Sequence, residues 1–156
     1  MTEYVLGFAF SAHLERVLLI RKNRPKWQMG KLNGLGGHIE SESKYVAMVR
    51  EFKEECGCDT TEQQWSYFCR MDGVDFTVHC FSTIADLLMC KTTTSERVEI
   101  ILVNEIKNLR LEMIENLPWL IYLAVDHLQD GRPNFTVSDY GPTPPLTDAT
   151  PATSAP

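Results

Sequence analysis

The sequence predicts an α+β domain in which a mixed β-sheet packs against helices. Strand-like runs outnumber helical ones, and their order does not follow the regular strand–helix alternation of a parallel α/β sheet. The chain has 156 residues, of which 44% are apolar and 23% charged. A chain of this length and composition can bury the core of one globular domain.

The strands are predicted from short apolar runs between polar turns. Runs at 4–10 and 16–20 are joined by the polar segment 11–15, which indicates a hairpin. The later strand-like runs are 65–71, 76–84, 99–103 and the short 135–137. Together they provide enough strands for one sheet.

Two helices are predicted from apolar spacing and end signals. Residues 44–56 form a helix that Ser43 caps and Gly57 ends, with an apolar stripe of Tyr45, Met48, Val49, Phe52 and Cys56. Residues 117–128 form a second helix, with Asn116 as N-cap, Pro118 in the first turn and Gly131 as stop.

The composition changes near the carboxyl end. Residues 141–156 contain five of the eight prolines, with Thr, Ala and Ser as most of the rest, and show no apolar period. This composition is typical of a disordered tail. We therefore expect a structured domain over 1–140 and a tail over 141–156.

Net charge, the amino-terminal sequence, the length of the apolar runs and the cysteine pattern argue against several classes of protein. The net charge of −6 argues against coating a nucleic-acid polymer, but it leaves small phosphate substrates open because bound cations reverse the local sign. The amino terminus lacks the features of a secretory signal, and the longest apolar stretches, 4–10 and 117–125, are too short to span a membrane. Five cysteines without a CxxC pair predict reduced thiols in a cytoplasmic protein, and the histidine spacing does not indicate a zinc site.

The chemistry of the sequence is concentrated in the first helix. Glu51, Glu54 and Glu55 stand at i, i+3 and i+4, so they share one helix face. Three neighbouring carboxylates repel one another unless a cation lies among them, and carboxylates are preferred ligands of Mg²⁺ and Mn²⁺. Arg50 can bond one of them, and Gly36 and Gly37 allow close approach of the backbone. The alternative for the three glutamates alone is a solvated acidic face.

The spacing around these glutamates matches a known signature. The segment reads Gly36-x5-Glu42-x7-Arg50-Glu51-Phe52-x-Glu54-Glu55-x-Gly57-Cys58, and it resembles the motif of the Nudix hydrolases at all seven fixed positions. There are two departures. Cys58 stands where an aliphatic residue is usual, and the loop after Gly37 is one residue shorter than in many members.

The resemblance implies a Nudix fold, which is an αβα sandwich with a mixed β-sheet and the loop–helix–loop of the motif. It implies hydrolysis of a nucleoside diphosphate linked to another group, with Mg²⁺ or Mn²⁺ as cofactor. Glu51, Glu54 and Glu55 would hold the metal, one of them would help to activate water, and Arg50 would orient a catalytic glutamate. A carbonyl ligand would come from Leu35 or Gly36, with Gly36 favoured. A further carboxylate would be Glu96 or Glu99, with Glu96 preferred.

Residues 16–19, the basic loop at 21–31 and residues 32–37 resemble MutT-type nucleoside triphosphatases that clear oxidised purine nucleotides. The implied substrate-binding residues are Lys22, Asn33, Gly37, Glu115, Asn116 and Trp119. The relatives use two acidic residues where this chain has Glu115 and Asn116, which weakens the case for oxidised purines. Each of these residues also has a purely structural explanation. Asn33 could cap a turn, Trp119 and Tyr122 could pack in the core, and Lys22 could lie in a solvated loop.

The leading hypothesis is therefore a nucleoside triphosphate pyrophosphohydrolase that releases nucleoside monophosphate and pyrophosphate. A rival is hydrolysis of another compound of this class, such as ADP-ribose, a nucleotide sugar or a dinucleoside polyphosphate. A non-catalytic binding module is the third possibility, but the intact glutamates disfavour it. The expected partner is a nucleotide rather than a nucleic-acid polymer or a membrane, with a monomer or a homodimer both open.

Overall fold

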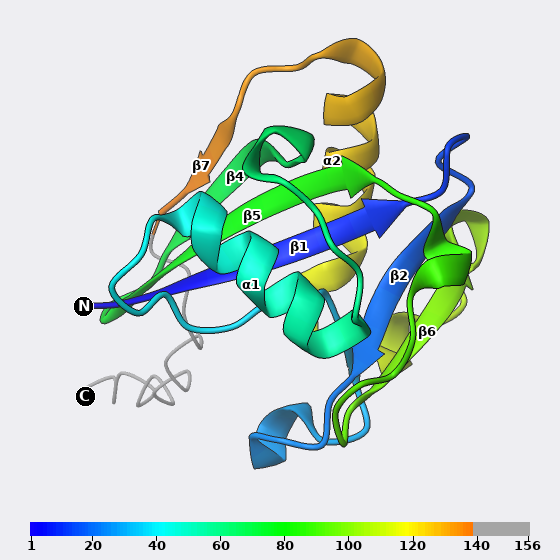
Figure 1. Cartoon of the computed structure of the whole chain (residues 1–156), viewed down its shortest axis with the longest axis horizontal. Helices are drawn as coiled ribbons and strands as arrows, with labels where there is room; N and C mark the ends of the chain where they lie inside the picture. Colours follow the sequence, from blue (N-terminus) through cyan, green and yellow to red (C-terminus); the bar gives the residue numbers. More distant parts are fainter. Residues whose placement is uncertain (139–156) are drawn as a thin grey trace, which may run out of the picture.

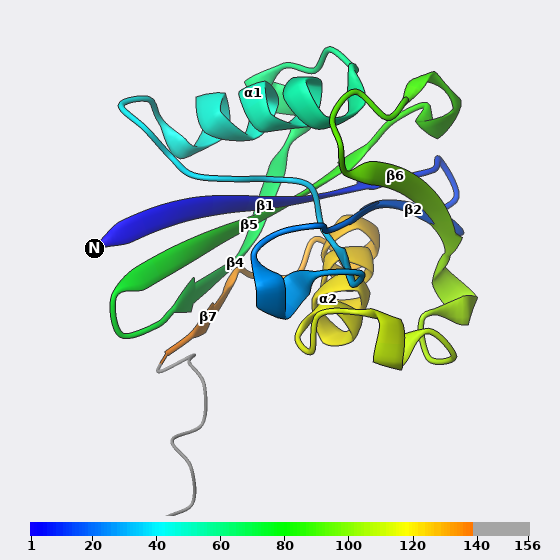
Figure 2. The same ribbon diagram turned by 90° about the horizontal axis from the view of Figure 1, so that it is seen from below.

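A computed structural model describes residues 1–138, so the predicted tail at 141–156 lies outside the described residues. Seven strands form one mixed sheet, with one helix on each face (Figures 1 and 2). The strands are β1 (Thr2–Phe10), β2 (Arg16–Arg21), β3 (Leu32–Asn33), β4 (Ser66–Asp72), β5 (Phe76–Ile84), β6 (Arg97–Leu102) and β7 (Phe135–Val137). The helices are α1 (Lys44–Cys56) and α2 (Leu117–Asp130), and short 3-10 turns occupy several connections. The predicted α+β class is confirmed.

The sheet is built around β1. Its order is β3-β2-β1-β5-β4-β7, and β6 pairs with β2. β1 runs parallel to β5 from the pair Thr2–Phe76 to the pair Phe10–Ile84, whereas it pairs with β2 only near the hairpin turn. Residues 35–38 therefore have room beside β1, where Leu35 bridges to Gly7 and His38 to Tyr4.

The alternation of side chains along β1 divides the core between the two helices. Val5 and Ala9 face the cluster that includes α1, whereas Leu6, Phe8 and Phe10 face the cluster that includes α2. Successive side chains of a strand point to opposite faces, so one apolar strand supports both layers. This explains why its sequence reads as a continuous apolar run.

The first helix has the bounds that its sequence predicts. The Ser43 hydroxyl accepts a hydrogen bond from the Val46 amide, and Gly57 adopts φ 74° while its N–H donates to the Lys53 carbonyl. A glycine in this left-handed conformation satisfies the carbonyls at the helix end without steric cost.

The second helix begins at Leu117 as predicted, but it ends later and has no side-chain cap. It extends to Asp130 before Gly131 ends it at φ 60°, two residues beyond the predicted bound. Asn116 is the N-cap residue, as predicted, but its side chain makes no capping hydrogen bond, because the residue has helical backbone angles and its side chain is buried. A side-chain cap needs an extended backbone at that position.

Several strand bounds also differ from the predicted ones by one or two residues. For example, β1 begins at Thr2 and β6 at Arg97. The five cysteines are all free thiols. In the described part of the chain, neither helix has the length and hydropathy that a bilayer crossing requires.

Candidate active site

The glycine segment brings the backbone close to α1. The Gly7 amide donates to the Leu35 carbonyl over 2.6 Å, and the Val5 amide donates to the Gly37 carbonyl over 2.9 Å. The Gly36 carbonyl takes no part in this pairing with β1, whereas the Gly36 amide donates to Oε2 of Glu55 over 2.8 Å. The Gly36 backbone is thus directed toward the acidic face of the helix.

The absence of a side chain at Gly37 makes room for a carboxylate. A Cβ added there would lie 2.5 Å from Oε1 and 2.6 Å from Oε2 of Glu51. Because real atoms do not approach so closely, any larger residue would displace Glu51. The glycine pair therefore supports the position of a glutamate on the neighbouring helix.

Arg50 holds the acidic residues and the loop together. Its guanidinium donates to Oε1 of Glu42 over 2.6 Å, to Oε1 of Glu51 over 2.7 Å and to the His38 carbonyl over 3.0 Å. The hydrogen bond to Arg50 lowers the pKa of Glu42, and the same contacts raise the pKa of Arg50. Such charge-assisted bonds fix both partners in place. Arg50 therefore links the loop before α1 to Glu51.

Glu55 is the most buried of the three helix glutamates, with only 8% of its surface exposed. Burial raises its pKa to about 7, and the carboxylates of Glu51 and Glu96 add to this rise. The Gly36 amide and the Lys22 ammonium oppose it. Glu55 thus lies in a pocket of negative charge that its own neighbours only partly neutralise.

Glu96 reaches this region from the segment before β6. Its carboxylate accepts hydrogen bonds from the Lys22 ammonium over 2.5 Å and from the Asn23 amide over 2.8 Å. Burial alone would raise the pKa of Glu96, but Lys22 and the Asn23 amide lower it overall. The structure therefore brings Glu96 and Lys22 beside Glu55. The role of the Asn23 amide is visible only in the structure, because every residue type except proline offers the same backbone N–H.

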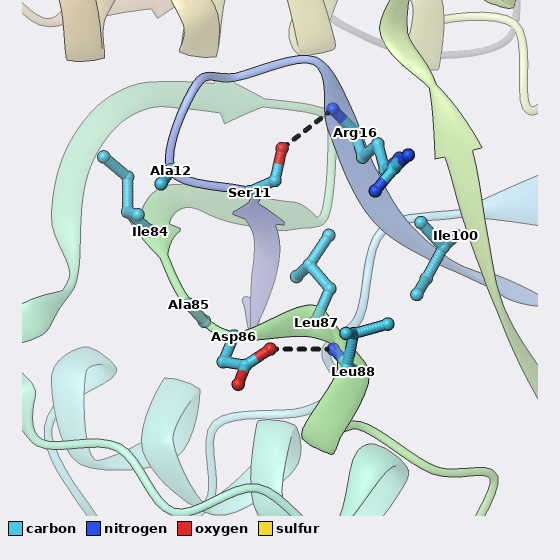
Figure 3. Close-up of a pocket in the computed structure, with 9 residues that line it drawn as sticks. All are labelled: Ser11, Ala12, Arg16, Ile84, Ala85, Asp86, Leu87, Leu88 and Ile100. Carbon is cyan, nitrogen blue, oxygen red and sulfur yellow. Dashed lines mark hydrogen bonds between the residues drawn. The ribbon is translucent and has the colours of Figure 1, made fainter.

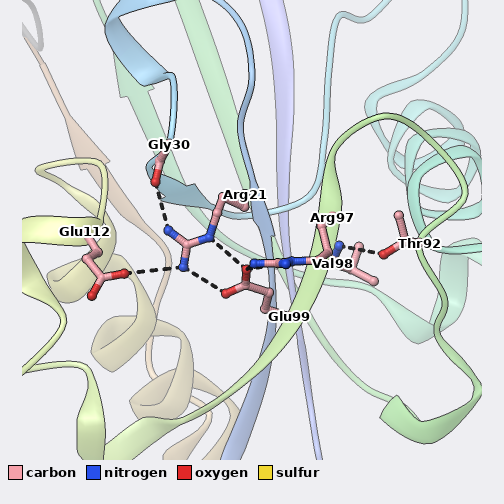
Figure 4. Close-up of polar contacts among 7 residues, drawn as sticks. All are labelled: Arg21, Gly30, Thr92, Arg97, Val98, Glu99 and Glu112. Atoms are coloured by element: carbon pink, nitrogen blue, oxygen red, sulfur yellow. Dashed lines mark hydrogen bonds and ion pairs between the residues drawn. The ribbon is translucent and has the colours of Figure 1, made fainter.

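Glu99, the other candidate for the distal carboxylate, has different partners. It lies in β6 and pairs with Arg21 over 2.7 Å and Arg97 over 2.6 Å (Figure 4). Arg21 also contacts Glu112 and the Gly30 carbonyl in the same network. Two arginines thus neutralise Glu99 away from the helix glutamates.

The residues predicted to contact the base lie in two adjoining segments, because Leu32 bridges to Met113 just before α2. Asn33 Oδ1 accepts from the Gly34 amide over 2.8 Å, so its expected turn-capping contact is present. Glu115 is exposed, whereas Asn116 is 93% buried and its Oδ1 has no hydrogen-bond partner among the described residues. Trp119 and Tyr122 are 39% and 44% exposed, so the alternative that they pack in the core is wrong.

Lys22 is likewise not a solvated loop residue, because its ion pair with Glu96 leaves its side chain only 16% exposed. Glu54, in contrast, keeps a side chain that is 57% exposed. The site therefore combines buried, bonded carboxylates with one that is open to solvent.

The donor set fits a hard divalent cation. Glu51, Glu54, Glu55 and Glu96 supply carboxylate oxygens, and such oxygens are the ligands that Mg²⁺ and Mn²⁺ prefer. A cation would also supply the positive charge that the buried Glu55 lacks. Arg50 and Lys22 hold Glu51 and Glu96 in ion pairs, so these two carboxylates would share or exchange a partner on binding.

A cavity of about 670 Å³ lies at a different place in the fold (Figure 3). It is bounded by the turn after β1 and by residues 84–88, and it contains none of the predicted site residues. Its lining is largely apolar, with Arg16 and Asp86 as its charged members. The site is therefore identified from side-chain chemistry and not from the size of a cavity.

Comparisons with known proteins agree on the fold. No protein-family model matches the sequence, and a search of curated proteins found no match. The solved structures that resemble it include MutT, from a study of the Aliivibrio salmonicida and Vibrio cholerae proteins. That structure has a TM-score of 0.67 and 20% identity over 80% of this chain and 98% of its own.

Two further similar structures are Nudix proteins. The Nudix domain of Shewanella oneidensis NrtR, solved with ADP ribose, has a TM-score of 0.69 and 16% identity over 81% of this chain and 88% of its own. A Nudix hydrolase from Nitrosomonas europaea has a TM-score of 0.69 and 16% identity over 89% and 78%. NrtR has also been solved with a 27mer DNA. At these identities the likeness establishes that the chain has the Nudix fold.

Proposed function

We propose that this chain is a divalent-cation-dependent hydrolase of the Nudix type that cleaves nucleoside triphosphates to nucleoside monophosphate and pyrophosphate. The observation that carries this proposal is that Glu55, with Glu51 and Glu96 as charged neighbours, lies beside the Gly36–Gly37 backbone, while Glu54 contacts Arg50 on the same helix. The motif predicts Glu51, Glu54 and Glu55, and Glu96, the preferred candidate for the further carboxylate, comes from a segment that is distant in the sequence.

Each residue has a distinct part in the proposed reaction. Glu51, Glu54, Glu55, Glu96 and the Gly36 carbonyl would hold Mg²⁺ or Mn²⁺. The cation, when bound, would neutralise the polyphosphate and lower the pKa of bound water. Arg50 keeps Glu51 in position through the 2.7 Å hydrogen bond, so it acts as a positioning residue. Glu54 is the glutamate most open to water and is our candidate for accepting the proton of the attacking water.

The substrate contacts follow from the groups around this centre. Lys22 carries positive charge next to Glu96 and would contact a phosphate. The unpartnered Oδ1 of Asn116 can accept a hydrogen bond from a base, and a buried amide oxygen without a partner carries a cost that such a bond removes. The half-exposed Trp119, in the first turn of α2, offers an aromatic face for stacking on a base. Asn33 Oδ1 accepts from the Gly34 amide and its Nδ2 donates to Oε1 of Gln28 over 3.3 Å, so Asn33 would reach a base with its second amide hydrogen or by exchanging the Gln28 contact.

Hydrolysis of another nucleoside diphosphate derivative is the second candidate. The structure of the NrtR Nudix domain with ADP ribose shows that this fold accommodates that ligand in a protein of similar shape. A purely regulatory, DNA-binding role is disfavoured here, because the chain has a net charge of −6 and keeps the motif glutamates.

The test is a substrate panel with Mg²⁺ that covers ordinary and oxidised deoxynucleoside triphosphates, ADP-ribose and dinucleoside polyphosphates, with every product identified. The proposal expects monophosphate and pyrophosphate from a triphosphate. Glu54→Gln should abolish turnover while the circular dichroism spectrum stays unchanged, and Glu62→Gln, at an exposed site outside the motif, is the matched control. Orthophosphate release, activity on ADP-ribose alone, or unchanged turnover of Glu54→Gln would refute it.

A further inference from the structure

Three cysteines that are far apart in the sequence meet at the end of α1. Cys56 and Cys58 flank Gly57, and Cys90 lies between β5 and β6. Their three Sγ atoms all lie within 4.8 Å of one another, and the Sγ atoms of Cys58 and Cys90 are 3.1 Å apart. The spacing of cysteines along the chain did not predict this cluster, because Cys90 is brought in by the fold.

The backbone around this thiol cluster, Cys56–Cys58–Cys90, is held by specific contacts. The Lys91 amide donates to the Cys56 carbonyl over 2.9 Å, and the Thr93 hydroxyl donates to the Glu54 carbonyl. These bonds satisfy carbonyls that the helix end leaves open. The positive φ of Gly57 turns the chain so that Cys58 returns toward Cys56.

The cluster is reachable from solvent. A cavity of about 370 Å³ includes Cys58, Asp59, Asp86 and Met89 in its lining. Cys56 is buried, while Cys58 and Cys90 are partly exposed. Asp59 pairs with Lys53 and Asp86 accepts from the Leu88 amide, so a water in the cavity is the group that can complete a coordination shell.

The surroundings of the cluster raise the pKa values of its thiols and so lower their reactivity. Burial raises the pKa of Cys58 to about 11, with a further rise from Cys90 and Asp59. The pKa of Cys90 is raised as well, chiefly by its hydrogen bond to Cys56 and by burial. Because the thiolate is the form that reacts with oxidants, these thiols are protonated and slow to oxidise when no positive charge is present. A cation would supply that charge.

We infer that Cys56, Cys58 and Cys90 form a binding site for one thiophilic divalent cation, Zn²⁺, with a fourth ligand from the adjoining cavity. Zinc binds thiolates at about 2.3 Å in tetrahedral geometry, which places the sulfurs about 3.8 Å apart. The observed separations reach that value with movements of about 1 Å. Binding replaces the three thiol protons, which pass to the buffer.

The site would be chemically distinct from the glutamate centre, since sulfur ligands select soft cations and carboxylates select hard ones. It would tie the end of α1, just after Glu54 and Glu55, to the segment that leads to Glu96. The inference does not rest on the proposed hydrolase activity, because its evidence is the geometry of the sulfurs alone.

The experiment titrates the reduced protein with Co²⁺, a spectroscopic substitute for Zn²⁺, in excess Mg²⁺ to occupy the carboxylates. We expect one Co²⁺ per chain with a thiolate charge-transfer band that Zn²⁺ abolishes. Cys58→Ser and Cys90→Ser should each weaken binding by about a hundredfold or more. The matched control is the double variant Cys69→Ala/Cys80→Ala, which removes the other two thiols and should bind normally.

A second measurement covers the case in which a variant fails to fold. In the unaltered protein, Zn²⁺ should protect Cys58 and Cys90 from alkylation, as read by peptide mapping. The inference is overturned if Co²⁺ binds without a thiolate band, if the band persists in Cys58→Ser and Cys90→Ser, or if Zn²⁺ gives no protection. Formation of a Cys58–Cys90 disulfide in place of metal binding under these conditions would also overturn it.

Discussion

Replacing Glu55 with glutamine should stabilise the metal-free protein at alkaline pH. Glu55 is 92% buried and has a pKa raised to about 7 from its ordinary value of 4.5, with burial as the main cause. Glutamine keeps an oxygen that can accept the Gly36 hydrogen bond, but it carries no charge to bury. The variant therefore isolates the cost of the buried charge.

The sign and size follow from the two pKa values. The folded state holds the proton more tightly than the unfolded state, so the stability that Glu55 contributes is fully present below about pH 4.5 and is lost as pH rises through 7. The difference between 4.5 and about 7 corresponds to about 3 kcal/mol. Near pH 8 the variant should thus exceed the parent protein by up to about 3 kcal/mol, or several degrees in Tm, and near pH 4.5 the two should be similar.

The assay is urea unfolding in EDTA from pH 4.5 to 8.5, followed by circular dichroism. Glu42→Gln is the control of opposite sign, since the Arg50 hydrogen bond lowers the pKa of Glu42. The stability that Glu42 contributes is present above its ordinary pKa and lost as pH falls, so its variant should be the weaker protein at pH 8. Mg²⁺ should stabilise the parent protein more than Glu55→Gln.

Equal pH dependence of stability in the parent protein and in Glu55→Gln would refute this reasoning. It would mean that Glu55 is solvated or already neutralised in the folded state. A variant that is weaker than the parent at pH 8 would show that its carboxylate takes part in a stabilising contact that glutamine does not replace.

Three further outcomes are expected. Gly37→Ala should lower kcat by about a hundredfold with little change in Tm, because a Cβ there would displace the Glu51 carboxylate; normal kcat would contradict the tight contact. Arg50→Lys should lower kcat by about tenfold or more at unchanged KM, since an ammonium cannot bond Glu42 and Glu51 together; equal kinetics would exclude a positioning role. Gly131→Ala should cost about 1 kcal/mol in urea unfolding, from its φ of 60° alone, and a stabilised variant would contradict that conformation.

The parts of the fold that depend on local sequence were predictable. Helix α1 has its predicted bounds, because a cap residue, an apolar stripe and a glycine stop act within one short segment. The strand Phe76–Ile84 was also predicted at its observed bounds. The parallel pairing of this strand with β1 was not predicted, because neither segment contains a local signal for its distant partner.

The candidate site likewise contains residues that the local sequence predicts and residues whose contacts depend on the fold. The motif predicts Glu51, Glu54, Glu55 and Arg50 together, because one helix carries them. The choice between Glu96 and Glu99 depends on where Arg21 and Lys22 point, which only the folded chain reveals. Asn116 stands at its predicted N-cap position, but the sequence did not indicate that its side chain would be buried and make no capping bond, because that depends on the residues packed around it.

The pairing of β1 with β5 has a consequence for how the chain is made. The first strand emerges from the ribosome early, yet its main partner follows only after residue 76. Until then β2, residues 35–38 and α1 can contact β1, but the edge that pairs with β5 is open and the side chains that face α2 lack that helix. Joining such distant segments slows folding and leaves an unpaired strand exposed during synthesis. The chain is thus most vulnerable to aggregation between the synthesis of β1 and that of β5.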